Sequence, residues 1–380
     1  MISPKTVSCV CTAFAVLSFP PVMPRHCIGL ATLVAVSILV PAAAFGQEAD
    51  ASAGPSDAPS SPWLLVPIVS SNPKIGTSGG VMAAFVKKFD PDSRVSLIGL
   101  MYQYTSTESS IGSAFARLSF RADLHRIVGI AAFGRINNDY QDYLGTGQPL
   151  QTQDDLRAVA GRYLYRVGGD WFLGAHGTAT NYQVFGVDPE DDLVLETLGM
   201  RGFSSAGLGA VIMHDSRDND DMPVRGWYMN VNNLAYREAF GGSDSYDAYR
   251  ADFKAFIRHG ARHVLAIRQF NWITHDAPAI AQSTVVLRGY KLGQYLAPYV
   301  SSLEAEERLS FGRRWGATMF AGVAALYGAT ATPLARSNFP TVGAGLQFIV
   351  KPDKHMLANL EYAQGIEDNH GIYLKFGYGW

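Results

Sequence analysis

Hydrophobic and polar residues alternate along most of the chain after residue 62. In segment 248–258 every second position is apolar, and charged residues fill most of the positions between them. The apolar positions are Tyr249, Ala251, Phe253, Ala255 and Ile257. A period of two is that of a β-strand, whose successive side chains point to opposite faces. The segment is therefore predicted to be a strand with one apolar and one polar face.

The same alternation recurs in segments 114–123, 159–166, 227–232, 356–362 and 372–380. Clusters of Gly, Asn, Asp and Pro separate such segments and predict turns between them. At about 20 residues for a strand with its connection, residues 62–380 allow about sixteen strands, an even number as in single-chain bacterial barrels. We place about eleven of them before Arg288 and about five after it. Segments 207–213 and 263–270 do not divide cleanly into faces, as expected where a lumen is filled.

Two architectures produce such alternation. A secreted sandwich buries its apolar faces in a core, whereas a membrane barrel turns them toward lipid. Here the polar face carries Arg together with Asp or Lys in single strands, which favours a wet lumen. No apolar run after residue 47 is long enough for a transmembrane helix. The predicted fold is all-β, a transmembrane antiparallel β-barrel, with the secreted sandwich as the alternative.

The N-terminal region predicts export. Residues 1–46 are interpreted as a signal peptide, with Met23 as an alternative start and cleavage near Ala44 or Gly46. Residues 47–61 are rich in Ala, Ser, Gly, Asp and Pro and are interpreted as a flexible linker. Residues 62–380 form the predicted barrel, and the expected location is the bacterial outer membrane.

Composition excludes several functions. The formal net charge is −2, which argues against a nucleic-acid partner. All 3 cysteines precede residue 28, so no thiolate chemistry is expected in the barrel. His259 and His263 have Arg258 and Arg262 as sequence neighbours, so we expect cation repulsion to make them poor metal ligands. No cofactor and no metal site is predicted.

Segment 76–80 reads Gly-Thr-Ser-Gly-Gly, the spelling of a hydrolase nucleophile elbow with Ser78 at its centre. That elbow needs a helix directly after the serine, and the residues that follow carry no helix signals. We therefore predict that the protein is not an enzyme. An outer-membrane hydrolase remains a minor alternative.

The segment Leu287-Arg288-Gly289-Tyr290 is the most informative short stretch. A glycine allows a backbone turn that would strain other residues, so Gly289 can direct Arg288 away from the chain. A buried guanidinium needs a carboxylate partner, because an unpaired buried charge costs about 3–5 kcal/mol. An arginine on an inward turn therefore predicts an acidic residue opposite.

This stretch resembles the arginine-tipped loop motif of the BamA/TamA outer-membrane assembly superfamily, also called the bacterial surface antigen barrel. Further matches are a turn motif, an Asp-Tyr-Leu-Gly-Thr-Gly element at 142–147 and a C-terminal sorting signal. The turn motif consists of Asp215, Arg217, Pro223 and Gly226, and the sorting signal of Phe376, Tyr378 and Trp380. Together these matches span most of residues 62–380.

The resemblance implies that the loop carrying Arg288, Gly289 and Tyr290 folds into the lumen ahead of the last five strands. In the family, the loop arginine often pairs with an acidic residue in a Phe-x-Asp-x-Gly pattern. Segment 319–322 of this chain reads Met-Phe-Ala-Gly and has no acidic residue. Glu306 is the candidate partner instead, and strand parity directs Glu304 and Arg308 to the same face. Assembly members carry POTRA domains before the barrel, whereas this chain is expected to have only the short linker 47–61 there.

The implied function is outer-membrane protein biogenesis or translocation. Members are thought to exploit a weak closure between the first and last strands, here 62–70 and 372–380. The implied partners are outer-membrane lipid, client outer-membrane or secreted polypeptides, and the barrel assembly machinery for the protein's own insertion. The alternative is a passive or substrate-specific pore.

Overall fold

The structure is a computed structural model. It describes residues 62–72, 76–140, 150–197, 202–219, 222–312, 314–328, 336–351, 356–367 and 369–376. The predicted signal peptide and linker lie outside the described residues, as do the 142–147 element, Tyr378 and Trp380.

Sixteen strands form one antiparallel sheet in which each strand pairs with its neighbour in the chain. These strands are β1 (Trp63–Asn72), β2 (Gly76–Lys87), β3 (Ser96–Thr105), β4 (Ser110–Phe120), β5 (His125–Tyr140), β6 (Leu150–Gly168), β7 (Trp171–Gly186), β8 (Gly202–Asp215), β9 (Gly226–Tyr236), β10 (Tyr246–Arg258), β11 (His263–His275), β14 (Tyr299–Phe311), β15 (Trp315–Tyr327), β16 (Asn338–Lys351), β17 (Met356–Gln364) and β18 (His370–Phe376). Eleven precede Arg288 and five follow it, which confirms the predicted count and division.

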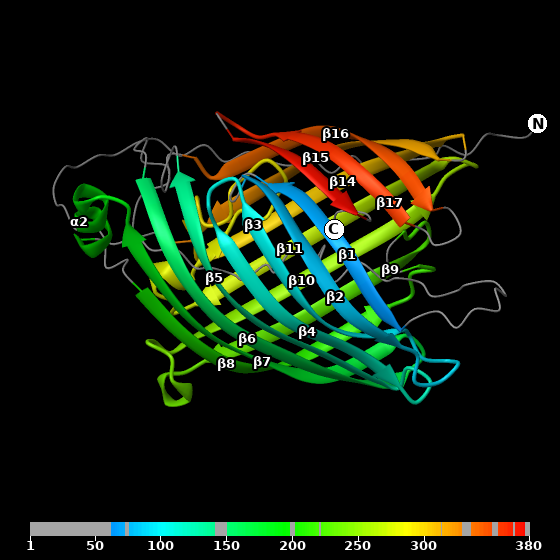
Figure 1. Ribbon diagram of the computed structural model, residues 1–380, viewed down its shortest axis with the longest axis horizontal. Coiled ribbons are helices and arrows are strands. Elements are labelled where there is room, and N and C mark those ends of the chain that lie inside the picture. The colour runs from blue at the N-terminus through cyan, green and yellow to red at the C-terminus, as the bar shows by residue number, and fades with distance from the viewer. Residues whose placement is uncertain are drawn as a thin grey trace, which may run out of the picture.

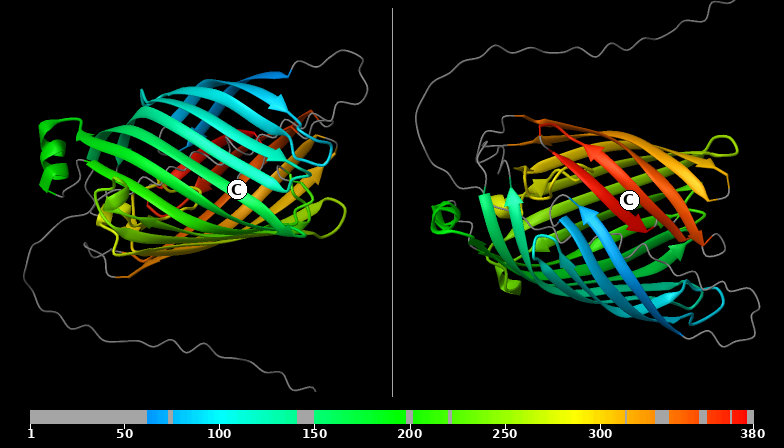
Figure 2. Two further views of the ribbon diagram at one scale, coloured as in Figure 1. Left: turned by 90° about the horizontal axis from the view of Figure 1, so that it is seen from below. Right: turned by 45° about the horizontal axis from the view of Figure 1, so that its top comes forward.

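The sheet curls around an interior so that β18 comes beside β1 (Figures 1 and 2). Some of their Cα atoms approach within 8 Å. Within the described residues, however, no backbone pairing joins β1 to β18. We call this junction the seam. The end of the sheet where β1 begins and β18 ends is the terminal end, and the opposite end is the far end.

The apolar face of the strands points outward and the polar face inward. On β17, for example, Leu360 and Tyr362 are exposed on the outer face, while Asn359 and Glu361 are buried on the inner face. The outer face carries aromatic residues near the terminal end (Trp63, Trp171, Phe311 and Trp315), aromatic residues near the far end (Tyr104, Tyr327 and Tyr362), and aliphatic residues between them (Leu303, Met319, Leu346). This is the outer surface of a membrane barrel, with two aromatic girdles around an apolar belt. A sandwich would bury these side chains.

The connection from β11 to β14, residues 276–298, enters the interior and holds η3 (Ala279–Ala281), β12 (Ser283–Thr284) and β13 (Leu296–Ala297) (Figure 1). We call it the inner loop. Its buried apolar residues pack on inward-facing residues of β11, β14, β15 and β16, among them Phe270 and Phe339. Phe270, at the end of segment 263–270, thus has an apolar partner on the inner face, as expected where the lumen is filled.

Helix α2 (Pro189–Thr197) follows β7 at the far end, where Leu195 packs in an apolar cluster with residues of β5, β6 and β7. Leu296 of the inner loop joins the same cluster. The loop therefore contacts both walls of the barrel near its far end. Among the described residues, no helix has the length and apolar character needed to cross a membrane.

The orientation of the faces predicts how a charge on the outer surface affects stability. Leu360→Arg, at the middle of the apolar belt, is expected to lower the free energy of unfolding by about 2–4 kcal/mol, because the guanidinium must enter hydrocarbon. Gln183→Arg, on the exposed outer face of β7 toward its far end, should change it little. Urea unfolding from lipid vesicles measures both. Equal losses in the two variants would contradict the lipid-facing orientation.

Candidate functional site

Arg288 lies at the centre of the interior contacts of the inner loop. Gly289 has a φ of +97°, the left-handed region in which a Cβ atom is strained. This turn directs the Arg288 side chain into the barrel wall formed by the last five strands. The backbone N–H of Gly289 donates to the Tyr373 hydroxyl of β18 at 2.7 Å.

Three carboxylates surround the Arg288 guanidinium. Nη2 lies 2.7 Å from Glu304 Oε1, Nη1 lies 2.7 Å from Glu306 Oε2, and Nη1 also lies 3.1 Å from Glu361 Oε2. The guanidinium carbon is 3.3 Å from the centre of the Phe320 ring, a cation–π contact. The structure thus places Glu306, the partner suggested by the sequence, directly against Arg288, and adds Glu304 and Glu361.

Arg288 and its acidic partners are all buried. Burial alone would lower the pKa of the Arg288 guanidinium, but the carboxylates of Glu304, Glu306 and Glu361 raise it above its ordinary value. The charge is therefore permanent. Arg308, whose Nε donates to Glu306 Oε1 at 2.6 Å, supplies a second cation to the same group of acids. We call Arg288, Arg308, Glu304, Glu306 and Glu361 the loop lock.

Neighbouring residues of the inner loop contact one further strand, β16, and the β17–β18 turn. The Tyr290 hydroxyl donates to the backbone oxygen of Pro340 in β16 at 2.5 Å and accepts from the backbone N–H of Ile366 at 3.1 Å. Thr341 Oγ1 donates to the backbone oxygen of Arg288 at 2.7 Å. With the loop lock on β14 and β17, Phe320 on β15 and Tyr373 on β18, the turn touches all five C-terminal strands.

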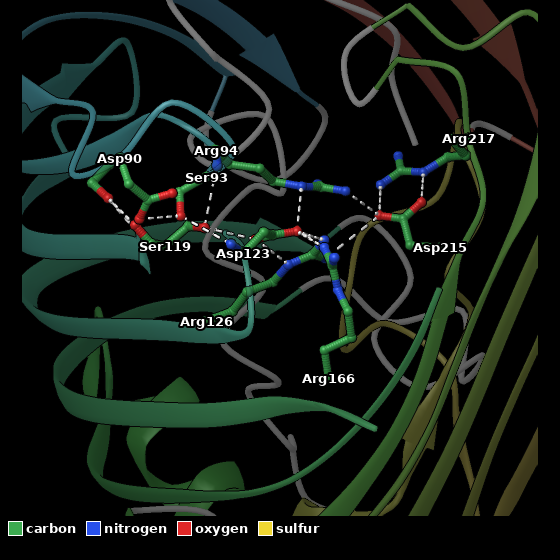
Figure 3. Close-up of polar contacts among 10 residues, drawn as sticks. Asp90, Ser93, Arg94, Ser119, Asp123, Arg126, Arg166, Asp215 and Arg217 are labelled. Atoms are coloured by element: carbon green, nitrogen blue, oxygen red, sulfur yellow. Dashed lines mark hydrogen bonds and ion pairs between the residues drawn. The ribbon is translucent and has the colours of Figure 1, made fainter. Parts of the chain in front are cut away.

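A second ionic cluster lies at the terminal end, where turns distant in the sequence converge (Figure 3). Asp123, in the β4–β5 turn, accepts from Arg126 Nε at 2.9 Å, from Arg166 Nη2 at 2.6 Å and from Ser119 Oγ at 2.7 Å. Arg94 Nε lies 3.5 Å from the same carboxylate. Asp123 is buried, so these cations replace its lost hydration.

Asp215 is the second acid of this cluster. It accepts from Arg217 Nε at 2.8 Å and from Arg94 Nη2 at 3.4 Å, and Arg126 Nη1 lies 3.9 Å away. We call Asp123, Asp215, Arg94, Arg126, Arg166 and Arg217 the terminal cluster. It joins the connections β2–β3, β4–β5 and β8–β9 with the terminal end of β6.

The remaining members of the predicted turn motif shape the β8–β9 connection. Gly226 has a φ of +94°, and a Cβ atom there would lie 2.1 Å from the backbone oxygen of Ser216, so only glycine fits. The backbone oxygen of Pro223 accepts from Arg308 Nη1 at 3.3 Å. The turn that holds Asp215 and Arg217 therefore also contacts the loop lock.

Sequence reasoning missed several residues of these networks. Glu361 carries no local motif, and neither does Asp123 with its arginine partners, whereas Asp215 and Arg217 belong to the predicted turn motif. The polar pair Asn359 and Glu361 inside an apolar alternation was a usable signal, since both had to face inward. Phe376 is the last described residue of β18, and nothing is concluded about its side chain.

Ser78 lies near the start of β2, which continues as a strand to Lys87. The strand-to-helix turn that a nucleophile elbow requires does not form there. The structure therefore does not give Ser78 the geometry on which the hydrolase alternative depended.

Comparison with known proteins shows which solved structures share this fold. No family model matches the chain, and no curated protein matches its sequence. Among solved structures, BamA from Haemophilus ducreyi lacking POTRA domains 1–3 aligns with a TM-score of 0.56 at 11% identity, over 84% of this chain and 70% of that one. CdiB from Escherichia coli aligns with a TM-score of 0.59 at 11% identity, over 84% of this chain and 63% of that one. CdiB from Acinetobacter baumannii aligns with a TM-score of 0.56 at 10% identity, over 83% of this chain and 59% of that one.

The chain therefore spans about three fifths of each CdiB structure and more of the BamA fragment. At this level of identity the likeness establishes the fold. The predicted fold, a transmembrane antiparallel β-barrel, is confirmed.

The loop lock predicts a large effect of removing its cation. Arg288→Ala should lower the free energy of unfolding by about 3–5 kcal/mol, because three buried carboxylates lose their shared partner. Arg135→Ala is the matched control, since Arg135 pairs with Asp155 on the exposed outer surface and should cost under about 1 kcal/mol. Heat-dependent gel mobility and urea unfolding in detergent measure both. An Arg288→Ala protein as stable as the control would rule out the lock.

The terminal cluster predicts a pH dependence. Burial alone would raise the pKa of the Asp123 carboxyl, but Arg126 and the other cations hold it below its ordinary value of 3.8. A depressed folded pKa means that the stabilisation is present above pH 3.8 and is lost as the pH falls through the folded value. Asp123→Asn should therefore cost about 2 kcal/mol at pH 7 and progressively less below pH 4. Asp276→Asn, at an exposed position, is the control for unfolding measured across this pH range.

Proposed function

We propose that this protein is an outer-membrane barrel that inserts or exports polypeptides through an opening at the seam between β1 and β18. The observation that carries the proposal is the contrast between the braced wall β14–β18 and the seam, across which no backbone pairing joins the described residues. The shared fold with BamA and CdiB and the resemblance of the Arg288 loop motif support it.

The edge of β1 has a built-in weakness. Val86 donates its backbone N–H to the backbone oxygen of Pro62 at 2.8 Å, which fixes which residues of β1 face β2. The backbone N–H and C=O groups of successive residues point to opposite sides of a strand. Because Pro62 faces β2, the backbone groups of Trp63, Leu65 and Pro67 point toward the seam. Pro67 has no N–H to give. The edge that faces β18 therefore lacks a donor near its middle.

The two sides of the seam are also held by different contacts. On one side, β18 is tied to the inner loop through Tyr373. On the other, β1 packs through Leu64 and Ile68 against an apolar cluster formed by β2, β3 and β4. Among the described residues, no buried apolar cluster includes members of both β1 and β18. Separation of the two strands would leave each wall with its own support.

An opened seam exposes two strand edges at the level of the membrane. Unpaired edges are templates for another strand, and an extended client segment can satisfy them by β-augmentation. The proposed partners are therefore extended client polypeptides and the surrounding lipid. The mechanism needs no covalent step, in keeping with the proposal that the protein is not an enzyme.

One observation favours the alternative of a solute pore. Arg250 belongs to the inner face of β10 and stacks on the Trp272 ring at 4.0 Å, and its buried Nε has no hydrogen-bond partner among the described residues. A cation that lacks a carboxylate in the interior would attract anionic solutes. This alternative predicts transport through the lumen without any opening of the seam.

A disulfide across the seam tests the proposal, since the chain has no cysteine after Cys27. A small panel would combine Leu65→Cys or Val69→Cys with Ile372→Cys or Leu374→Cys. The control pair is Leu360→Cys with Leu374→Cys, which are partners in the β17–β18 ladder and leave the seam free. The oxidised seam variant is expected to insert an unfolded outer-membrane barrel into vesicles no faster than empty vesicles do, with recovery on reduction.

Ion conductance of the same proteins in planar bilayers separates the two functions. If the seam-locked protein inserts the client at the rate of the control pair, the opening mechanism is wrong. If neither protein promotes insertion while both conduct anions, the pore is the better description.

A further inference from the structure

A group of potential metal ligands lies on the outer face of the sheet near the terminal end. His259 belongs to the β10–β11 turn, His263 begins β11, and Glu307 lies on β14. Nε2 of His259 is 2.9 Å from Glu307 Oε2, and Nδ1 of His263 is 2.8 Å from Glu307 Oε1. One nitrogen from each histidine and a carboxylate oxygen all lie within 4.8 Å of one another.

The fold brings these three side chains together from separate positions. The backbone N–H of His259 donates to the backbone oxygen of His263 at 3.1 Å, which closes the turn and sets the two imidazoles side by side, with ring centres 5.3 Å apart. Glu307 is the ladder partner of Leu265, two residues beyond His263. Diagonal positions of this kind are within reach of long side chains.

The sequence-based objection to a metal here was repulsion by Arg258 and Arg262. Side chains alternate along β10, so Arg258 shares the face of the buried Phe256, which points inward. His263 and Glu307, at odd positions of β11 and β14, share the outer face with exposed residues such as Leu303. The sheet therefore separates Arg258 from the group, and Arg262 is exposed in the turn.

Glu307 is in an unfavourable place for an uncompensated charge. Its ladder partners on the outer face are Leu265 and Met319, and Met319 is strongly exposed. Phe311 follows toward the terminal end of β14. A carboxylate among such residues faces the apolar belt, where a charge costs stability. Neutral imidazoles can donate hydrogen bonds to it, but they do not cancel its charge, whereas a divalent cation does.

We propose that His259, His263 and Glu307 bind one divalent late-transition-metal ion of the zinc type. Two imidazole nitrogens and one carboxylate oxygen suit Zn²⁺ and its neighbours, whereas Mg²⁺ and Ca²⁺ prefer oxygen ligands alone. Three protein ligands leave the fourth tetrahedral position to water. Small side-chain rotations bring the ligand atoms to the 2.0–2.1 Å that Zn–N bonds require. On binding, the N–H proton that each neutral imidazole shares with Glu307 moves through solvent to the other ring nitrogen, and the nitrogen so freed ligates the ion.

The position of this site gives it a structural role that is independent of the proposed function. Glu306 and Glu307 are adjacent on β14 but face opposite sides of the sheet. Inside, Glu306 is held by Arg288 and Arg308. Outside, the ion ties Glu307 to the β10–β11 turn. The strands on both sides of the inner loop, β11 and β14, are thus joined on the outer face as well as by their ladder.

Calorimetric titration of the full chain, folded in detergent, with Zn²⁺ alone tests the proposal. The expected result is one ion per chain and a higher unfolding temperature, with no such response to Mg²⁺. His263→Gln and Glu307→Gln should each weaken Zn²⁺ binding by more than about tenfold. His275→Gln is the matched control, because His275 pairs with Asp276 at an exposed position with no third ligand. It should bind Zn²⁺ as the parent chain does.

Heat-dependent gel mobility without zinc shows whether each variant is folded. If Glu307→Gln does not fold, His259→Gln and His263→Gln remove a ligand without changing the carboxylate and take its place. Failure of the parent chain to bind Zn²⁺, or binding that persists unchanged in folded His259→Gln and His263→Gln, overturns the proposal. Neither result bears on opening of the seam, so this test and that of the proposed function fail separately.

Discussion

The interaction on which the architecture depends is the burial of one arginine among three carboxylates. Glu304, Glu306 and Glu361 line the inner face of two strands and could not stay ionised there without a cation. The loop supplies that cation, and the wall supplies three carboxylates that compensate the buried guanidinium. The loop arginine and the wall carboxylates therefore require one another. This explains why the connection before the last five strands turns inward rather than extending from the far end.

This requirement extends along the barrel through a continuous series of polar contacts. Arg288 binds Glu306, Glu306 binds Arg308, and Arg308 donates to the backbone oxygen of Pro223 in the β8–β9 turn. The same turn holds Asp215 and Arg217, whose partners Arg94 and Arg126 reach Asp123. The inner loop near the far end and the turns at the terminal end are thus parts of one network. It fixes the walls relative to each other without including β1.

The sequence predicted those features that depend on local pattern. Period-two alternation predicted the strands, chain length predicted their number, and the Arg-Gly-Tyr turn predicted an acidic partner. The inward loop was implied by the resemblance of that turn to a known loop motif. The pairing of Glu361 with Arg288 could not be found in this way, since Glu361 lies 73 positions after Arg288 and reaches it only when the sheet curls. Asp123 and its partner Arg94 were missed for the same reason, because they meet Asp215 only after strands of different length bring their turns to one end. For His259 and His263, adjacency in sequence to Arg258 and Arg262 did not show on which face of the sheet each side chain lies.

The free energies of the contacts between strands explain why an opening would occur at the seam rather than elsewhere. A backbone hydrogen bond contributes about 1 kcal/mol net, whereas breaking a buried ion pair costs about 3–5 kcal/mol. The described part of β18 is 7 residues long, and β1 offers one donor fewer because Pro67 occupies its edge. Among the described residues, every other pair of adjacent strands is joined by a backbone ladder, interrupted at Gly209 and Ala210 between β8 and β9. The strands near the inner loop add the loop lock. The free-energy cost of separating strands is therefore smallest where β1 meets β18, and the arginine that stiffens the last five strands also confines the movement to their edge.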